Sequence, residues 1–256
     1  MIVAKIENIH SAENVLRSTY YLSSALDKKF GVVCFVSDNQ LVDGVKAEIT
    51  TYLTRINLPI DNVFVLNEKE GSLVDFCEQE EVSFLILQVL EDSRKTLQKG
   101  LNHCRDLRIP YLFFKKDFEV FGFKKVLLPV GFLVEEYEKA QFASAFGRFC
   151  NATILILQAN DYGTKAAVTV DKMCTLFDKF SLRYSVEKAK KDSFKLDKEA
   201  VEKATVEKYD VLIVSASREY GLDDLIFGPN ELQVVKKSTI PVLIINPRED
   251  LYTLCD

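Results

Sequence analysis

The sequence predicts an α/β protein of two tandem domains, each an open five-stranded parallel sheet with the element order βαβαβαβαβ. Short apolar runs alternate with segments whose apolar residues recur at helical spacing, which is typical of a parallel sheet with helices on both faces. The same order of elements occurs twice along the chain. An Ile-Pro pair precedes the last apolar run of each half, at 109–110 and at 240–241.

The strands are expected at corresponding places in the two halves. Those of the first half lie at 2–6, 30–37, 62–66, 82–90 and 107–115, and those of the second at 125–130, 151–158, 182–188, 209–217 and 238–246. Runs such as VLIV are apolar without interruption, as in strands that are buried on both faces. We therefore expect parallel sheets with covered faces.

The helices between these strands are predicted from the spacing of apolar residues. In the first half the marker residues are Val15, Thr19, Leu22 and Leu26, then Val45, Ile49, Leu53 and Ile56. In the second half they are Phe142, Ala145, Phe146 and Phe149, then Ala166, Val170, Met173, Phe177 and Phe180. Further helices are expected near 72–80 and 197–208, and one more before each Ile-Pro pair.

The domain boundaries follow from this repeat. We expect domain 1 at residues 1–116, a short linker at 117–123, domain 2 at 124–248 and a C-terminal tail at 249–256, with domains of ordinary size. The linker carries Phe118, Phe121 and Phe123, whereas a free linker would be polar or rich in glycine and serine. It is therefore predicted to pack down and fix the two halves against each other.

Composition excludes several classes of protein. The 256 residues are 48% hydrophobic and 28% charged, with a net charge of -5, so duplex nucleic acid is not an expected partner. No apolar run approaches the roughly 18 residues that span a bilayer, and IVAKI after Met1 is too short for a signal peptide. These features predict a cytoplasmic protein without a membrane partner.

Motifs of common catalytic and metal sites are missing. The sequence contains no CxxC, HExxH or GxSxG pattern, and no GxGxxG follows the first strand of either half. The two histidines, His10 and His103, are interpreted as surface or capping residues. We therefore predict no catalytic residue and no metal site.

The doubled pattern, with Ile-Pro before each final strand, resembles the universal stress protein family in its tandem form. KKVLLPVGF and STIPVLIIN are similar to the two ends of a family domain. The resemblance implies an adenine-nucleotide alpha-hydrolase-like fold. It also implies that the two halves associate as a pseudo-dimer through their final strands, with a homodimer of chains as a further option. In members that bind ATP, a glycine-rich loop after the fourth strand holds the phosphates.

That loop is degenerate in this sequence. With the last family glycine placed at Gly228, the two earlier glycines become Ser215 and Arg218, and Gly221 is kept. Pro229, which lacks an N–H donor, replaces the following Ser or Thr, and Gly131 replaces the Asp that closes the first strand. GPNE is equally a helix start, with Gly228 as cap, Pro229 in the first turn and Glu231 complementing the helix dipole. The first half retains only Gly100 in its corresponding loop.

Three functions remain open on this basis. The leading prediction is a non-catalytic regulatory protein of the universal stress type, which acts through an unnamed protein partner and has lost its ATP site and any cofactor. The alternative is an ATP- or AMP-binding switch in the second half, lined by Val130, Gly131, Ser215, Ser217, Arg218, Gly221, Gly228 and Asn230. The third, slow ATP hydrolysis that depends on Arg218, has the family resemblance as its only motive.

Overall fold

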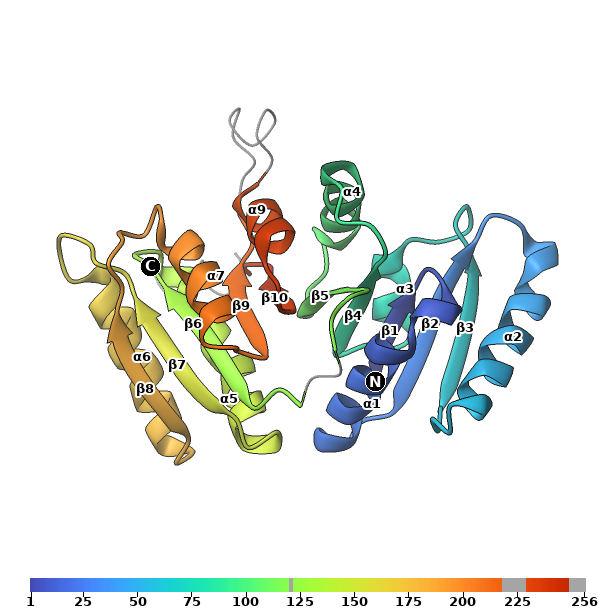
Figure 1. Ribbon diagram of the computed structural model, residues 1–256, viewed down its shortest axis with the longest axis horizontal. Helices are drawn as coiled ribbons and strands as arrows, with labels where there is room; N and C mark the ends of the chain where they lie inside the picture. Colours follow the sequence, from blue (N-terminus) through green and yellow to red (C-terminus); the bar gives the residue numbers. More distant parts are fainter. Residues whose placement is uncertain (120–121, 218–228, 249–256) are drawn as a thin grey trace. The chain divides into compact units, whose positions relative to one another are not determined.

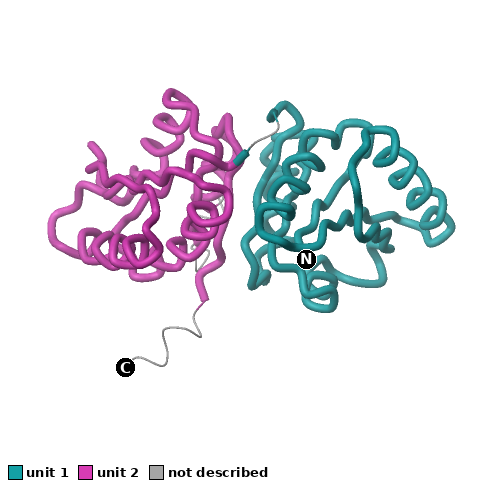
Figure 2. Tube along the Cα trace, turned by 90° about the horizontal axis from the view of Figure 1, so that it is seen from below, with its two compact units in different colours: residues 1–122 teal, residues 123–256 magenta. Residues whose placement is uncertain are grey.

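The computed structural model describes residues 1–119, 122–217 and 229–248 (Figure 1). The chain divides into two compact units, unit 1 from Met1 to Gly122 and unit 2 from Phe123 to Asp256 (Figure 2). Each unit contains a five-stranded parallel sheet, which confirms the predicted α/β class and its parallel halves. The pseudo-dimer of the two units stays a prediction.

Unit 1 alternates strands and helices in the predicted order. Its strands are β1 (Ile2–Ile6), β2 (Phe30–Val36), β3 (Asn62–Asn67), β4 (Phe84–Val89) and β5 (Tyr111–Lys115). Its helices are α1 (Glu13–Ala25), α2 (Val42–Arg55), α3 (Leu73–Gln79) and α4 (Arg94–Cys104), with the short 3₁₀ helices η1 (Ile9–Ser11) and η2 (Asn39–Leu41) before α1 and α2.

Unit 2 repeats this arrangement. Its strands are β6 (Lys125–Val130), β7 (Thr153–Gln158), β8 (Arg183–Lys188), β9 (Val211–Ser215) and β10 (Val242–Ile245). Its described helices are α5 (Lys139–Phe149), α6 (Lys165–Lys179), α7 (Leu196–Val206) and α9 (Asn230–Lys237), with the 3₁₀ helix η3 (Val134–Glu138) before α5.

The strand order is the same in both units. It runs β3-β2-β1-β4-β5 in unit 1 and β8-β7-β6-β9-β10 in unit 2. The first strand of each unit therefore lies between the second and the fourth, so that the order reverses between β1 and β4 and between β6 and β9. In sheets of this kind a ligand crevice forms outside the carboxyl ends of the strands at such a reversal.

The helices cover both faces of each sheet. In unit 2, α5 and α6 lie on one face of the sheet, and α7 and α9 lie on the other (Figure 1). The central strand β4 is buried along its whole length, because helices pack on both sides, and β10 is buried as well. The edge strand β8 differs, since five of its six residues are exposed. The start of α3 is fixed by a local feature of the sequence, a capping box formed by Ser72 and Asp75.

Phe118 and Phe123, the aromatic residues of the linker that lie in the described part of the chain, are buried. The Phe118 ring lies 5.6 Å from the Phe114 ring in unit 1, and the Phe118 carbonyl accepts a hydrogen bond from Asn14. Phe123 is buried in unit 2, where its ring stacks on Phe146 at 5.3 Å. Phe121 lies outside the described residues. Phe118 therefore packs in unit 1 and Phe123 in unit 2, which explains the non-polar composition of the linker.

None of the helices in the described parts of the chain is long and apolar enough to cross a membrane.

Candidate functional site

The candidate site is the crevice at the carboxyl ends of β6 and β9 in unit 2, which we call the unit 2 crevice. Val130 and Ser215 are the last residues of these two strands, and Gly131 and Ser217 follow closely after them. The structure thus brings four of the predicted residues to one edge of the sheet. Arg218, Gly221 and Gly228 lie outside the described residues.

Gly131 is closely covered by another loop of the same unit. A Cβ atom at position 131 would lie 2.8 Å from Ser193 Oγ, which is nearer than side chains normally approach. Ser193 is held there because its hydroxyl donates to Asp161 Oδ2 at 2.5 Å, and its N–H donates to Asp161 Oδ1 at 2.8 Å. Ser193 Oγ also accepts the N–H of Phe132 at 3.0 Å. The space beside Gly131 is therefore filled by the protein itself.

A buried ion pair lies under the same loop. Lys139, at the first position of α5, is 1% exposed, and its ammonium group pairs with Glu136 and donates to the Pro129 carbonyl at 2.5 Å. The Glu136 carboxylate also accepts the N–H of Gly131 at 3.4 Å. A buried charge is tolerated when it is paired and hydrogen-bonded, and both conditions are met here.

Glu231 links the start of α9 to the segment that follows β9. Glu231 is 2% exposed, and its carboxylate accepts both the N–H of Ser217, at 3.2 Å, and the Ser217 hydroxyl, at 2.9 Å. The expected helix start needs one correction. The helix begins at Asn230, and Pro229 is the N-cap residue with ψ of 158°, so the proline precedes the first turn. Glu231 therefore occupies the place near the helix N-terminus where an anion would be favoured.

Asp197 brings a further carboxyl group to this region from the first turn of α7. Burial raises its pKa to about 6, Lys139 opposes that shift, and the nearby carboxylates Glu136 and Glu231 add to it. Asp197 is thus influenced by one buried ammonium group and by two carboxylates. The described part of the unit 2 crevice therefore contains several interacting charged groups.

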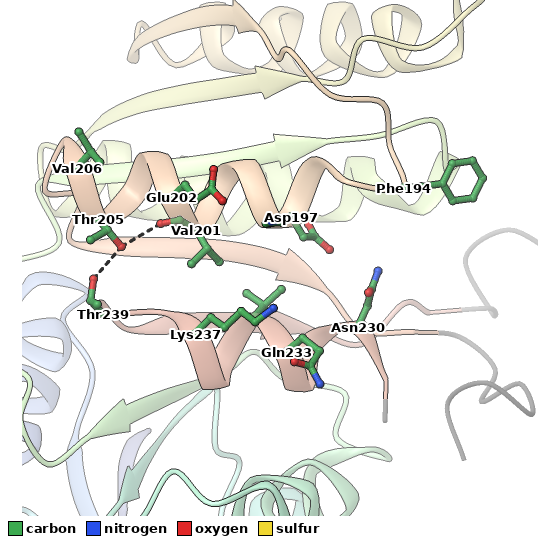
Figure 3. Close-up of a pocket in the computed structure, with 12 residues that line it drawn as sticks. Phe194, Asp197, Val201, Glu202, Thr205, Val206, Asn230, Gln233, Lys237 and Thr239 are labelled. Carbon is green, nitrogen blue, oxygen red and sulfur yellow. Dashed lines mark hydrogen bonds between the residues drawn. The ribbon is translucent and has the colours of Figure 1, made fainter. Parts of the chain in front are cut away.

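Asn230 lies in a different feature, an open groove of about 580 Å³ between α7 and α9. Figure 3 shows Asp197, Asn230 and Phe194 toward one end of this groove, and Thr205 and Thr239 at the other. The hydroxyl groups of Thr205 and Thr239 are 2.9 Å apart and link α7 to the segment before β10. Val201 and Val234 contribute apolar lining. The prediction that Asn230 belongs to the nucleotide crevice remains untested.

Sequence reasoning missed the side chains that close the unit 2 crevice. Ser193 and Asp161 lie in loops after β8 and β7, and Lys139 resembled an ordinary helix-start lysine. One signal was available for Lys139, because an i,i+3 spacing from Glu136 permits a pair on one helical face. Nothing in the sequence indicated that Ser193 would reach Gly131.

The described residues do not form a metal centre. Within residues 1–119, 122–217 and 229–248, no group of three or more His, Cys, Asp or Glu side chains is arranged to hold a metal ion. Both histidines are exposed, as expected, and His10 Nε2 lies 3.0 Å from Glu48.

Comparison with known proteins places the fold. No family model and no curated protein matches the sequence. Among solved structures, a universal stress protein from Archaeoglobus fulgidus DSM 4304 is similar over 97% of this chain and 97% of its own, with a TM-score of 0.66 and 15% identity. This chain has the tandem universal stress protein fold.

Other solved structures are similar to this chain over nearly its full length. A Pseudomonas aeruginosa UCBPP-PA14 protein assigned to the universal stress proteins matches over 99% of this chain and 95% of its own, with a TM-score of 0.65 and 14% identity. The cytoplasmic domain of a prokaryotic cation chloride cotransporter matches over 99% and 98%, with a TM-score of 0.60 and 11% identity. At these identities the universal stress likeness concerns the fold alone.

Proposed function

We propose that this protein is a non-catalytic regulator of the universal stress type, acting in the cytoplasm through contacts with other proteins and without ATP. The observation that carries the proposal is the closure of the unit 2 crevice by its own side chains. Ser193 fills the space beside Gly131, and Glu231 accepts the N–H of Ser217. A phosphate loop needs such N–H groups to face a ligand.

Charge supports the same conclusion. A triphosphate near Ser217 would meet the carboxylates of Glu231 and Glu136, and two like charges about 4 Å apart repel by roughly 1 kcal/mol in water and by more near a protein. The buried cation Lys139 is already paired with Glu136. Nucleotide entry would therefore require several internal contacts to break.

The Ser193–Asp161 pair needs separate consideration because a serine beside a carboxylate can be a nucleophile. Here Ser193 Oγ donates to Asp161 and simultaneously accepts the Phe132 N–H, so one of its lone pairs is engaged. The same hydroxyl packs against Gly131. These contacts favour a structural role that ties two loops to the end of β6.

Isothermal titration calorimetry of the full chain with ATP and Mg²⁺, and separately with AMP, tests the proposal. We expect no saturable heat change. Binding in the micromolar range at one site per chain would overturn it. In that case Gly228→Trp would show whether the nucleotide uses the predicted loop, because a bulky side chain there should abolish binding to that loop and leave any other site unchanged.

A further inference from the structure

We infer that the loop end of unit 2 is a docking surface for an acidic segment of a partner protein that also carries large apolar side chains. The surface combines apolar residues from three loops with nearby lysines, and we call it the aromatic–lysine surface. It consists of Phe132, Leu133, Val134, Tyr162 and Phe194, with Lys165, Lys190, Lys191 and Lys195. This inference deepens the proposed function, and it rests on the part of that proposal that concerns protein contacts.

The apolar part of the surface is unusually exposed. Phe194 is 81% exposed, Val134 61% and Leu133 45%, and Tyr162 is fully exposed. Among the described residues of unit 1, by contrast, Leu41 is the one large hydrophobic side chain in this exposed class. Single exposed apolar side chains are ordinary, but several on neighbouring loops indicate an interaction site.

The three loops are held together before any partner arrives. Asp161 accepts from Ser193, and Ser193 accepts from Phe132, so one hydrogen-bonded chain joins the loops after β7, β8 and β6. The rings of Phe132 and Phe194 lie 5.6 Å apart. Furthermore, η3 packs against α6, which brings Val134 toward the helix that follows Tyr162. A surface ordered in advance loses less conformational entropy when it binds.

The loop after β8 has a charge of opposite sign to that of the whole chain. Residues 188–198 read KAKKDSFKLDK, with five lysines and two aspartates, although the net charge of the chain is -5. The N–H groups of Lys190 and Lys191 donate to Glu199, which fixes the backbone of this loop. Among the ion pairs of the described residues, none involves the ammonium groups of Lys165, Lys190, Lys191 or Lys195. An acidic partner would complement them.

The adjoining groove favours a peptide over other anionic partners. Phe194 belongs both to the aromatic–lysine surface and to the open groove of about 580 Å³ between α7 and α9. Peptide segments are recognised by grooves that accept individual apolar side chains, whereas a bilayer presents a broad surface that does not enter a groove between helices. The groove itself carries charges of both signs, with Lys198 and Lys237 beside Asp197 and Glu202, so the apolar lining is what would accept side chains of the peptide.

Fluorescence anisotropy with the full chain tests the inference. The probe is a short labelled peptide that alternates acidic residues with Leu and Phe, and we expect saturable binding. Phe194→Ser and the double variant Lys190→Glu/Lys191→Glu should each weaken binding about tenfold. The matched control is Lys28→Glu/Lys29→Glu in unit 1, which changes net charge equally at two exposed lysines and should leave affinity within about twofold.

Each contrary result has a distinct meaning. Equal weakening by both lysine pairs, or no effect of Phe194→Ser, would show non-specific attraction and overturn the surface. Binding to phosphatidylserine vesicles but not to the peptide would replace the protein partner by a membrane. Tighter probe binding by a chain ending at Arg248 would identify residues 249–256, EDLYTLCD, as the occupant and overturn the partner assignment. Absence of peptide binding would refute this inference alone, whereas ATP binding would refute the proposed function.

Discussion

The two units cap the same backbone groups with different chemistry. The N–H of Ser83 donates to Met1 in unit 1 and that of Asp210 to Lys125 in unit 2, so Glu7 corresponds to Gly131 and Asn8 to Phe132. In unit 1 these two N–H groups both donate to Gln88 Oε1, at 2.8 and 2.9 Å.

In unit 2 these two N–H groups have two different acceptors, one from η3 and one from the loop after β8. Glu136 accepts the N–H of Gly131, and Ser193 accepts that of Phe132. The residue equivalent to Gln88 is Ser215, because Leu85 and Leu212 each donate to the carbonyl of the proline before the last strand. A neutral amide thus closes one crevice, and a charged network closes the other. The comparison teaches that the unit 2 network depends on a buried ion pair, Glu136 with Lys139, whereas unit 1 uses a neutral amide for the same N–H groups.

The largest expected effect is on the buried ammonium group of unit 2. Lys139→Met removes the ammonium donor from the Glu136 carboxylate and from the Pro129 carbonyl. Breaking a buried pair in this way costs about 3–5 kcal/mol of unfolding free energy. Urea unfolding measures it, with the exposed Lys172→Met on α6 as the control that should change little. A loss below about 1 kcal/mol would show that the pair is effectively solvated.

The neutral crevice of unit 1 should be less sensitive. Gln88→Leu removes the acceptor of the Glu7 and Asn8 N–H groups and the donor to the Asn8 carbonyl and Ser11. Leaving buried polar groups without partners costs about 1–3 kcal/mol. Chemical denaturation should show this loss at every pH from 5 to 8, because no titrating group is involved. The exposed Gln79→Leu on α3 serves as its control. A pH-dependent loss would contradict the distinction between the two crevices.

The packing of Ser193 on Gly131 can be tested by paired substitutions. Gly131→Ala should destabilise the protein by about 1–2 kcal/mol because the new methyl group would lie too close to Ser193 Oγ. Ser193→Gly removes that oxygen, so the double variant should lose less stability than the two single losses added together. Thermal unfolding of the four proteins completes the cycle. Additive losses would mean that the two positions do not contact each other.

The smallest expected effect is a change in stability on substitution of Asp197, and it depends on pH. Burial raises its pKa to about 6, so the folded state holds a proton that the unfolded chain releases near pH 4. The wild-type protein should therefore lose stability as pH rises from about 4 to 6. Asp197→Asn should remove this loss and gain on the order of 1 kcal/mol at pH 7, with no gain near pH 3.5. A pH-independent difference between the two proteins would refute the raised pKa.

Sequence reasoning succeeded where the signal was local. The order of strands and helices follows from periodicity within each segment, as the apolar spacing of Val15, Leu22 and their neighbours shows, and the repeated Ile-Pro pair marked both final strands. The glycine at position 131 was also visible in the sequence. The residue that packs against it was not, because Phe132 and Ser193 lie 61 residues apart.

The amino-acid sequence by itself determined the doubled α/β architecture, since burial of alternating strands and amphipathic helices requires only short-range patterns. It also determined that position 229 has no N–H donor, because the residue there is proline. The tertiary structure alone decided how each crevice is closed. The loop after β8, the 3₁₀ helix η3 and the start of α9 bring Ser193, Glu136 and Glu231 to the ends of β6 and β9. Such long-range contacts depend on the packed backbone, and no local propensity specifies them.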